Sequence, residues 1–299
     1  MTEAEREQLL KRWTAPPSDS EEQRAENAWR VISNAVRDST LLSTRDIEVF
    51  LQGSYKNDTN VRLESDVDIC VCLKETVTTD YSFAPGVDDK STGVTRPARY
   101  PHDRFKNDLQ TILNSAFGSA NVKRGSKAFH VKENSYRVDV DVVPCLEHRR
   151  YAPDRSYITG TALFPDNGGQ IYNYPHQHYL NGVEKNGRTR SFFKCSVRIM
   201  KNMRNKMEDE GIPQAKPIAS FFNECLVWNT PDQILLASNW NLTVQQMLVH
   251  LWDHLQSEEK CGGWGQVSEL LYLFKGPNSL SREQAKAWVK AAWNWLDYK

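Results

Sequence analysis

Two short segments of the chain alternate between polar and apolar residues, which is the pattern of β-strands. The first, Ser-Asp-Val-Asp-Ile-Cys-Val-Cys-Leu from position 65, places Asp66 and Asp68 on one face and apolar residues on the other. The second, Arg-Val-Asp-Val-Asp-Val-Val from position 137, does the same with Asp139 and Asp141. If the two strands are neighbours, three or four carboxylates meet on one small area of a sheet.

Helical periodicity flanks these strands in the first half of the chain. Ser18 and Glu21 have the spacing of a capping box, and the helix predicted after them carries Trp29, Ile32 and Val36 on one side. A second helix is predicted to end at a glycine stop signal at position 118. Its apolar residues at helical spacing are Phe105, Leu109, Ile112, Leu113 and Ala116.

The remaining segments predict strands, a loop and a helical C-terminal half. Ile47–Leu51 reads as a short strand, and residues 122–143 as further strands that turn at Asn134–Ser135. The polar stretch 75–101 contains Pro and Gly and predicts a long surface loop. From position 189 onward we expect helices near residues 190–208, 216–228, 243–257 and 282–297.

This order of elements predicts an α+β protein with two lobes. We expect a mixed-sheet lobe with an N-terminal helix in residues 1–180 and a helical lobe in residues 181–299, with a ligand cleft between them. Several tryptophans of the C-terminal helices are predicted to be core or lobe-contact residues: Trp252, Trp288, Trp293 and Trp295.

Composition narrows the class of protein. The 299 residues include 38 basic residues (Lys and Arg) and 38 acidic residues (Asp and Glu), so the net charge is zero. A neutral chain argues against a protein that coats nucleic acid without sequence preference. No apolar run approaches the roughly 20 residues of a membrane span, and the N-terminus lacks a hydrophobic signal region. The six cysteines contain no Cys-x-x-Cys pair and indicate a reducing environment. These features predict a cytoplasmic protein without a membrane partner.

The chemistry centres on a Gly-Ser turn and the acidic strands. Gly53 and Ser54 follow the strand Ile47–Leu51, and a turn of this kind presents backbone N–H groups to phosphates. Carboxylates from two strands would repel one another unless bound divalent cations neutralise them. We therefore predict a pair of Mg²⁺ ions, with Mn²⁺ as a substitute, at a phosphoryl-transfer site.

A basic helix supplies a second candidate feature. Lys194, Arg198 and Lys201 fall at i, i+4 and i+7, beside an apolar stripe, and no acidic residue lies between positions 185 and 206. Such a stripe would grip a triphosphate, or it is simply a solvated basic face.

The motifs together resemble those of the bacterial CD-NTases, relatives of cyclic GMP-AMP synthase and oligoadenylate synthase. The matching stretch runs roughly from residue 48 to residue 232 and is most similar to the E clade. It includes Gln-Gly-Ser-Tyr from position 52, Asp-Val-Asp from 66, Asp-Val-Val-Pro from 141, Ile-Tyr-Asn-Tyr-Pro from 171 and Ser-Phe-Phe-Asn-Glu-Cys from 220. The resemblance implies a polymerase β-like nucleotidyltransferase lobe and cyclic dinucleotide second messengers in anti-phage (CBASS) signalling.

Roles for individual residues follow from this resemblance. Asp66, Asp68 and Asp141 would be the catalytic metal ligands, with Asp141 rather than Asp139 as the third carboxylate because it directly precedes Val-Val-Pro. The nucleotide-binding residues would be Gly53, Ser54, Lys194, Lys201, Ser220 and Asn173. The partners implied are nucleoside triphosphates, ATP and UTP among them, and a downstream effector that binds the product.

Asn173 is the candidate for base selection. In E-clade enzymes that use uridine nucleotides an Asn at the matching place contacts the pyrimidine, and an amide has both donors and an acceptor for the edge of uracil. A pyrimidine-containing product such as cyclic UMP-AMP is therefore expected. The other interpretation is a turn-favouring Asn before Tyr-Pro.

Two alternative functions stay open at the level of sequence. A template-independent polymerase that makes linear oligonucleotides shares the three carboxylates but needs a basic, aromatic-lined track. A silent binding protein would usually lose one of the carboxylates, and here all three are present. His250 and His254 have a metal-ligand spacing but lack a third ligand, so we interpret them as ordinary helix residues. A nucleic-acid activator is not expected.

Overall fold

A computed structural model describes residues 1–61, 66–94, 100–276 and 280–299, and the contacts divide the chain into two units. The sheet unit consists of Ser18–Lys56 and Glu64–His176. The helical unit consists of Met1–Pro17, Asn57–Leu63 and Gln177–Lys299. The helical unit is therefore built from three separate stretches of the chain, and the short middle stretch directly follows the Gly-Ser turn.

Seven strands of the described residues form one mixed sheet in the sheet unit. Strand β2 (Val67–Asp80) pairs parallel to β5 (Val140–Tyr151), and every other neighbouring pair is antiparallel. The order along the main path is β1 (Ile47–Leu51), β2, β5, β4 (Phe129–Val131) and β3 (Val122–Arg124). Off this path, β6 (Tyr157–Leu163) pairs with the later residues of β5, and β7 (Ile171–Asn173) pairs with β6.

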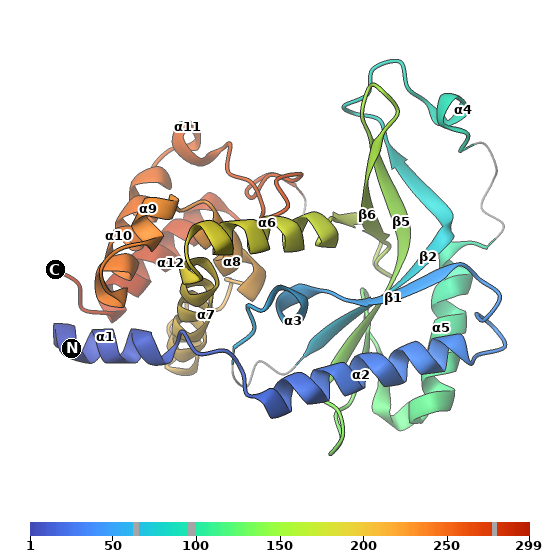
Figure 1. The fold of residues 1–299 in the computed structure, drawn as a ribbon, viewed down its shortest axis with the longest axis horizontal. Helices are drawn as coiled ribbons and strands as arrows, with labels where there is room; N and C mark the ends of the chain where they lie inside the picture. The colour runs from blue at the N-terminus through green and yellow to red at the C-terminus, as the bar shows by residue number, and fades with distance from the viewer. Residues whose placement is uncertain (62–65, 95–99, 277–279) are drawn as a thin grey trace. The chain divides into compact units, whose positions relative to one another are not determined.

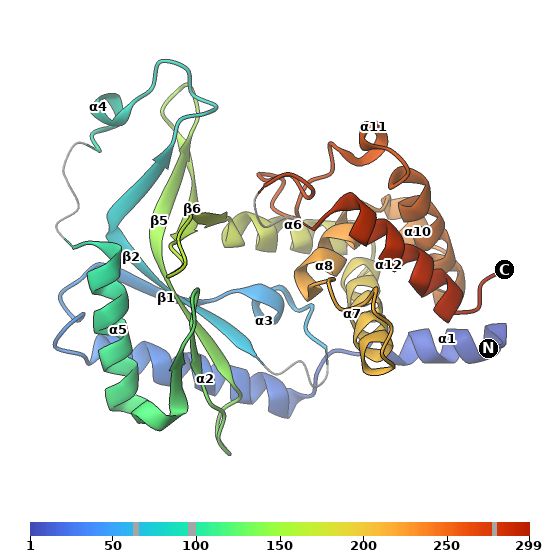
Figure 2. The ribbon, with the colours of Figure 1, turned by 180° about the vertical axis from the view of Figure 1, so that it is seen from behind.

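Two helices, α2 (Asp19–Arg37) and α5 (His102–Phe117), lie side by side against one face of this sheet (Figures 1 and 2). Glu21 accepts a hydrogen bond from the backbone N–H of Ser18 at 2.9 Å, so the predicted capping box starts α2. Gly118 ends α5 as expected, with φ +81°. Valine, isoleucine and leucine side chains of β2 and β5 pack under the two helices, which confirms that the apolar face of each strand enters the core.

The predicted surface loop at residues 75–101 is wrong for its first part. Strand β2 continues to Asp80, because Val77–Asp80 pair with β5 after a register shift that begins at Leu73. The residues of this extension are mostly β-branched, and the buried Thr76 hydroxyl donates a hydrogen bond to the Tyr100 carbonyl oxygen at 3.0 Å. A short helix, α4 (Asp89–Thr92), follows, while residues 95–99 lie outside the described part of the chain.

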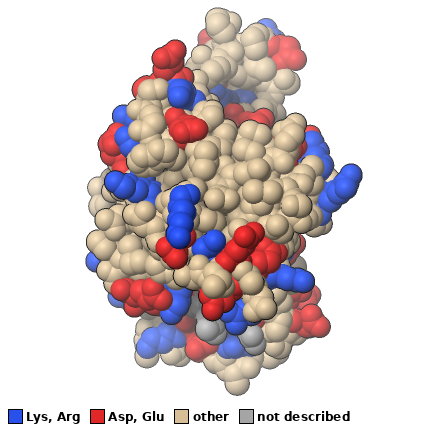
Figure 3. All heavy atoms as spheres, turned by 90° about the vertical axis from the view of Figure 1, so that its left-hand side faces the viewer, with Lys and Arg blue, Asp and Glu red and all other residues tan. Residues whose placement is uncertain are grey.

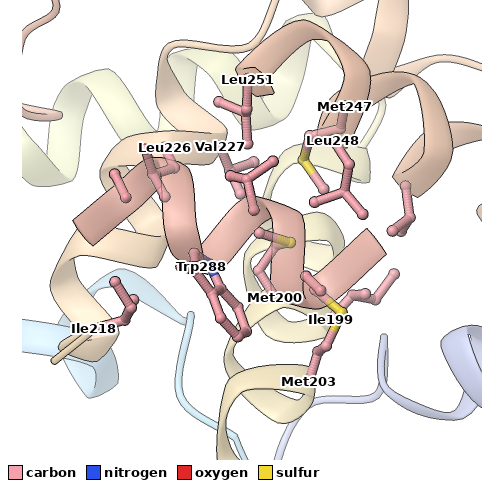
Figure 4. Packing of buried hydrophobic residues seen from close by; sticks show 14 of the residues in the cluster. Ile199, Met200, Met203, Ile218, Leu226, Val227, Met247, Leu248, Leu251 and Trp288 are labelled. Carbon is pink, nitrogen blue, oxygen red and sulfur yellow. The ribbon is translucent and has the colours of Figure 1, made fainter. Parts of the chain in front are cut away.

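The helical unit has its own hydrophobic core. The four helices predicted for the C-terminal half are present as α7 (Phe192–Asp209), α8 (Ser220–Trp228), α10 (Trp240–His254) and α12 (Arg282–Trp295). Figure 4 shows that side chains from all four helices meet in one cluster, with the fully buried Trp288 among them. Trp252, Trp293 and Trp295 are partly buried against the same cluster, as expected.

Several helices were not predicted from the sequence. The described residues also form α1 (Glu3–Arg12), α3 (Gly53–Asn57), α6 (Pro175–Arg188), α9 (Asp232–Leu235), α11 (Glu258–Cys261) and the 3₁₀ turn η1 (Ser119–Asn121). α6 has a weak sequence signal because His, Gln, Asn and Gly occupy many of its positions.

The cysteines behave as small core residues. All six are free thiols, and five of them are buried. Cys70 and Cys72 of β2 pack with Cys145 of β5 on the sheet face opposite α2 and α5. Among the described residues, no helix combines the length and the apolar character that a membrane span requires.

We expect Gly160→Ala to destabilise the sheet unit. A Cβ at this position of β6 would lie 2.6 Å from the Asn173 carbonyl oxygen and 2.8 Å from the ring of the buried Tyr174. The expected cost is about 1–3 kcal/mol of unfolding free energy, measured by urea denaturation. Gly187→Ala in α6 is the control, since nothing lies within 4 Å of its Cβ and helix propensity predicts a gain of about 0.5–1 kcal/mol. A Gly160→Ala protein as stable as the wild type would contradict this packing.

Candidate functional site

Asp68 and Asp141 lie directly opposite each other in the sheet. They are register partners of the parallel pair β2 and β5, whose backbones run about 4.8 Å apart. Asp66 immediately precedes β2, two residues before Asp68. The expectation that the two acidic segments are neighbours is confirmed, and the pairing is parallel and in register, which the alternation alone did not predict.

The acidic residues face away from the helix-covered core. Asp68 alternates with Val67 and Ile69, both fully buried under α2 and α5, so its side chain lies on the same face as Cys70. On β5, Asp141 alternates with the buried valines in the same way. The sheet unit therefore presents the carboxylates together on one face.

The surroundings of Asp141 disfavour its negative charge. Burial raises the pKa of this carboxyl above its ordinary value, and the negative charge of Asp66 raises it further. The imidazole of His130 opposes the shift, with its Nδ1 3.4 Å from Asp141 Oδ1. Asp141 thus lies in an anionic environment that favours a bound cation.

His130 is a site residue that sequence reasoning missed. It is the register partner of Asp141 on β4, and its Nε2 lies 3.6 Å from Asp139 Oδ1. One imidazole ring therefore contacts both carboxylates of the second acidic segment, which confirms that these two share a side of the chain. The alternating Phe-His-Val of β4 was the available signal, but three residues are too few to fix a strand partner.

The donor set suits a hard divalent cation. In the side-chain positions of the described residues, no three His, Cys, Asp or Glu groups are close enough to hold a metal ion. The groups gathered here are nevertheless carboxylate oxygens, the ligands that Mg²⁺ and Mn²⁺ prefer. Their mutual repulsion at Asp141 is the kind of strain that a bound cation relieves.

The Gly-Ser turn packs directly on one of these carboxylates. Gly53 begins α3 with φ +67°, and a Cβ on it would lie 2.3 Å from Asp68 Oδ2. The Gln52 N–H also donates to the Asp68 carbonyl oxygen at 3.0 Å. Because only glycine combines this backbone angle with this approach, Gly53 fixes the turn against the acidic strand.

The basic stripe of α7 is not a solvated face. Arg198 is buried, and its guanidinium donates to the carbonyl oxygens of Asp58 at 2.8 Å and Thr14 at 2.7 Å. Lys194 Nζ lies 3.4 Å from Asp58 Oδ2. Lys201 is only 1% exposed. Two of the three cations thus fix other parts of the helical unit.

The other predicted residues lie in different units. Asn173 ends β7, is half-buried and pairs with Thr161 of β6 in the sheet unit. Ser220 is the first residue of α8 in the helical unit. The rings of His250 and His254 lie 4.0 Å apart, and each contacts a backbone carbonyl oxygen, as expected for ordinary helix residues.

We expect Gly53→Ala to cost more stability than a glycine substitution with the same backbone strain. Gly86 is the matched control, because its φ is +80° and nothing lies within 4 Å of its Cβ. Gly86→Ala should cost about 1–2 kcal/mol from left-handed strain alone. Gly53→Ala should cost at least about 1 kcal/mol more, since the Asp68 carboxylate must move. Equal unfolding free energies of the two variants in urea would show that the turn does not press on Asp68.

Two family models match the chain. A nucleotidyltransferase domain matches residues 31–161, and a cGAS/DncV-like nucleotidyltransferase C-terminal helical domain matches residues 180–297. Together they cover most of the chain, and they correspond to a mixed-sheet domain followed by a helical domain, which confirms the predicted fold class.

Curated relatives match over nearly the whole length. A protein of Legionella pneumophila named cyclic dipyrimidine nucleotide synthase CdnE is 44% identical over 292 residues, which cover 97% of each chain. A protein of the same name from Cecembia lonarensis is 39% identical, with 98% of each chain covered.

Solved structures of similar proteins have the same fold. The Elizabethkingia meningoseptica CdnE cyclic dinucleotide synthase with GTP and Apcpp superposes with a TM-score of 0.82 at 30% identity, covering 98% of this chain and 99% of its own. The Rhodothermus marinus CdnE c-UMP-AMP synthase with Apcpp and Upnpp gives a TM-score of 0.84 at 28% identity, covering 98% and 97%. The chain therefore belongs to the cGAS/DncV-like nucleotidyltransferase (CD-NTase) family and, within it, to the E clade of CdnE enzymes.

Proposed function

We propose that this enzyme is a cyclic dinucleotide synthase that joins two nucleoside triphosphates and releases pyrophosphate. The observation that carries the proposal is the in-register pair of Asp68 and Asp141, with Asp66 beside it and Gly53 packed on Asp68. Relatives that match nearly the whole chain are named cyclic dipyrimidine or cyclic dipurine nucleotide synthases. The substrates come from the cytoplasmic pool of nucleoside triphosphates.

The acidic residues would supply the metal site of this reaction. Asp66 and Asp68 would hold two Mg²⁺ ions, with Mn²⁺ as a substitute, and Asp141 would share one of them. When bound, the ions lower the pKa of the attacking ribose hydroxyl and neutralise the α-phosphate and the leaving pyrophosphate. The pKa of Asp141, raised by burial and by Asp66, indicates that the carboxylates alone are poorly neutralised.

Residues around the turn and on α7 and α8 would hold the donor nucleotide. The backbone N–H groups of Gly53 and Ser54 suit its triphosphate, and Lys201 adds a positive charge for the same group. Ser220 would lie near the donor base. A second attack within the linear intermediate would close the ring; this step is proposed from the names of the relatives.

We propose that the product contains a pyrimidine. Two relatives at 44% and 39% identity are named dipyrimidine synthases, and a cyclic UMP-AMP synthase from Rhodothermus marinus is 36% identical over 190 residues. A cyclic dipurine nucleotide synthase from Elizabethkingia meningoseptica is 31% identical over 295 residues, below the identity of the two dipyrimidine synthases. Asn173 is the residue proposed to contact uracil, since a half-buried amide provides both donors and an acceptor. The product would serve as a signal to an effector in anti-phage (CBASS) defence.

A linear-oligonucleotide polymerase is less well supported. Such an enzyme needs a continuous basic track with aromatic side chains for a nucleic-acid strand. On the face drawn in Figure 3, lysine and arginine side chains are interspersed with aspartate and glutamate among large uncharged areas. The balanced composition of 38 basic and 38 acidic residues agrees with this picture.

A product assay on the wild type and on two variants, Asp141→Asn and Asp139→Asn, tests the proposal. We expect purified protein with ATP, GTP, CTP, UTP and Mg²⁺ to give a phosphatase-resistant cyclic product in mass spectrometry. Asp141→Asn should lower the rate by on the order of 100-fold to 1,000-fold, because it removes a metal ligand. Asp139→Asn should retain most activity, since its Oδ1 still accepts the 2.6 Å hydrogen bond from the Glu133 N–H. A ladder of linear products, or equal loss in both variants, would contradict the proposal.

Base selection is tested at Asn173. We expect Asn173→Ser to lower kcat/KM for UTP relative to ATP by about tenfold or more, because the shorter side chain leaves the base edge unpaired. Asn294→Ser, on an exposed position of α12, is the control for the same substitution. An unchanged ratio of UTP to ATP use would show that Asn173 takes no part in base recognition.

A further inference from the structure

One imidazole ring lies between two carboxylates on the acidic face of the sheet unit. His130 of β4 places Nδ1 3.4 Å from Oδ1 of Asp141 and Nε2 3.6 Å from Oδ1 of Asp139. Each ring nitrogen is therefore close to a different carboxylate of the second acidic segment. Only one of the two, Asp141, is a ligand in the proposed metal site, so the histidine contacts a ligand and a carboxylate that is not one.

The fold determines where His130 lies. Its neighbours in β4, Phe129 and Val131, are fully buried in the core with α2 and α5. Because side chains alternate along a strand, His130 projects from the opposite face, on which Asp68 and Asp141 lie. Strand β4 is paired on both sides, with β3 and β5, and its register places His130 beside Asp141. Strand pairing and the burial of two apolar side chains thus hold the histidine next to this carboxylate.

Asp139 is already engaged by the protein itself. Its Oδ1 accepts a 2.6 Å hydrogen bond from the backbone N–H of Glu133, in the chain that leaves β4. Its backbone carbonyl oxygen accepts a 3.0 Å hydrogen bond from the N–H of Val67, at the start of β2. Asp139 therefore anchors neighbouring segments of the chain through the same carboxylate oxygen that His130 approaches.

Asp141 has a different set of contacts. Its Oδ1 is the oxygen near His130, and the contact does not involve its Oδ2. Carboxylates that bind metal ions in proteins are usually hydrogen-bonded to a further residue, which orients them toward the ion. A histidine N–H that holds one oxygen leaves the other oxygen for a cation. The contact between His130 and Asp141 has this arrangement.

We propose that His130 is a positioning residue for the metal site: it holds Asp141 through Nδ1 and so makes Asp141, rather than Asp139, the third carboxylate ligand. This inference rests on the proposed function, in which Asp66, Asp68 and Asp141 bind the divalent ions. The histidine contacts neither the ions nor the nucleotides, and it acts through one oxygen of Asp141.

The two ring nitrogens can be tested separately. An Asn side chain places its amide nitrogen near the position of Nδ1, and a Gln side chain places its amide nitrogen near that of Nε2. His130→Asn therefore keeps a donor for Asp141, while His130→Gln keeps one for Asp139. We expect His130→Gln to weaken the binding of Mn²⁺ alone by about 10-fold or more, and His130→Asn by less than about threefold. Electron paramagnetic resonance of free Mn²⁺ measures both affinities without nucleotide.

A double-mutant cycle identifies the carboxylate that transmits the effect. In an Asp141→Asn background, His130→Gln should have almost no further effect on Mn²⁺ affinity, because the histidine acts through this residue. In an Asp139→Asn background the full loss should remain, since the Asn Oδ1 still accepts the hydrogen bond from the Glu133 N–H. Equal losses in the two backgrounds would overturn the inference.

His176→Gln is the matched control, because this histidine is exposed and belongs to helix α6 rather than to the sheet. It should leave Mn²⁺ affinity unchanged. A purely structural role of His130 predicts lower melting temperatures of both His130 variants, with Mn²⁺ affinities that equal that of the wild type or fall equally. Either result overturns the inference, and so does a larger loss in His130→Asn than in His130→Gln.

The outcome also separates this inference from the proposed function. If the wild type makes a cyclic product and both His130 variants bind Mn²⁺ as tightly as the wild type, the positioning role is wrong and the synthase assignment stands. If the wild type makes no product, the assignment fails, and the Mn²⁺ titrations decide the role of His130 by themselves. A wild type that binds no Mn²⁺ overturns the inference.

Discussion

The parallel pairing of β2 with β5 is the constraint on which the rest of the site depends. It places Asp68 and Asp141 in register, with Asp66 immediately before β2. Burial and the negative charge of Asp66 raise the pKa of Asp141, so the folded sheet holds an electrostatic conflict that a divalent cation relieves. The apolar residues between them are buried under α2 and α5, and this burial keeps the strands in place against the repulsion.

The helical unit holds its basic side chains in fixed positions. Lys201 is buried, while Lys194 and Arg198 are engaged with Asp58. In the proposed reaction, cations would neutralise the triphosphate and carboxylates would hold the metal ions. The stretch Asn57–Leu63, which follows the Gly-Ser turn, belongs to the helical unit.

Much of the fold and part of the site followed from the sequence. Alternation around Asp68 and Asp141 predicted which face each strand buries, because a period of two leaves no choice once one face is apolar. It did not predict their parallel register, which depends on pairing between distant segments. The extension of β2 to Asp80 was missed because its Thr and Val residues gain stability only by pairing with β5. His130 was missed because its importance comes from neighbours that are remote in sequence.

We propose that the three aspartates form one metal site, and locating the bound metal ions is a direct test. A crystal structure of the wild type with Mn²⁺ and a non-hydrolysable UTP analogue locates the ions by anomalous scattering. We expect manganese bound by Asp66, Asp68 and Asp141, with the triphosphate against the Gly53–Ser54 turn. Manganese bound elsewhere, or a triphosphate bound without contact to these aspartates, would contradict it.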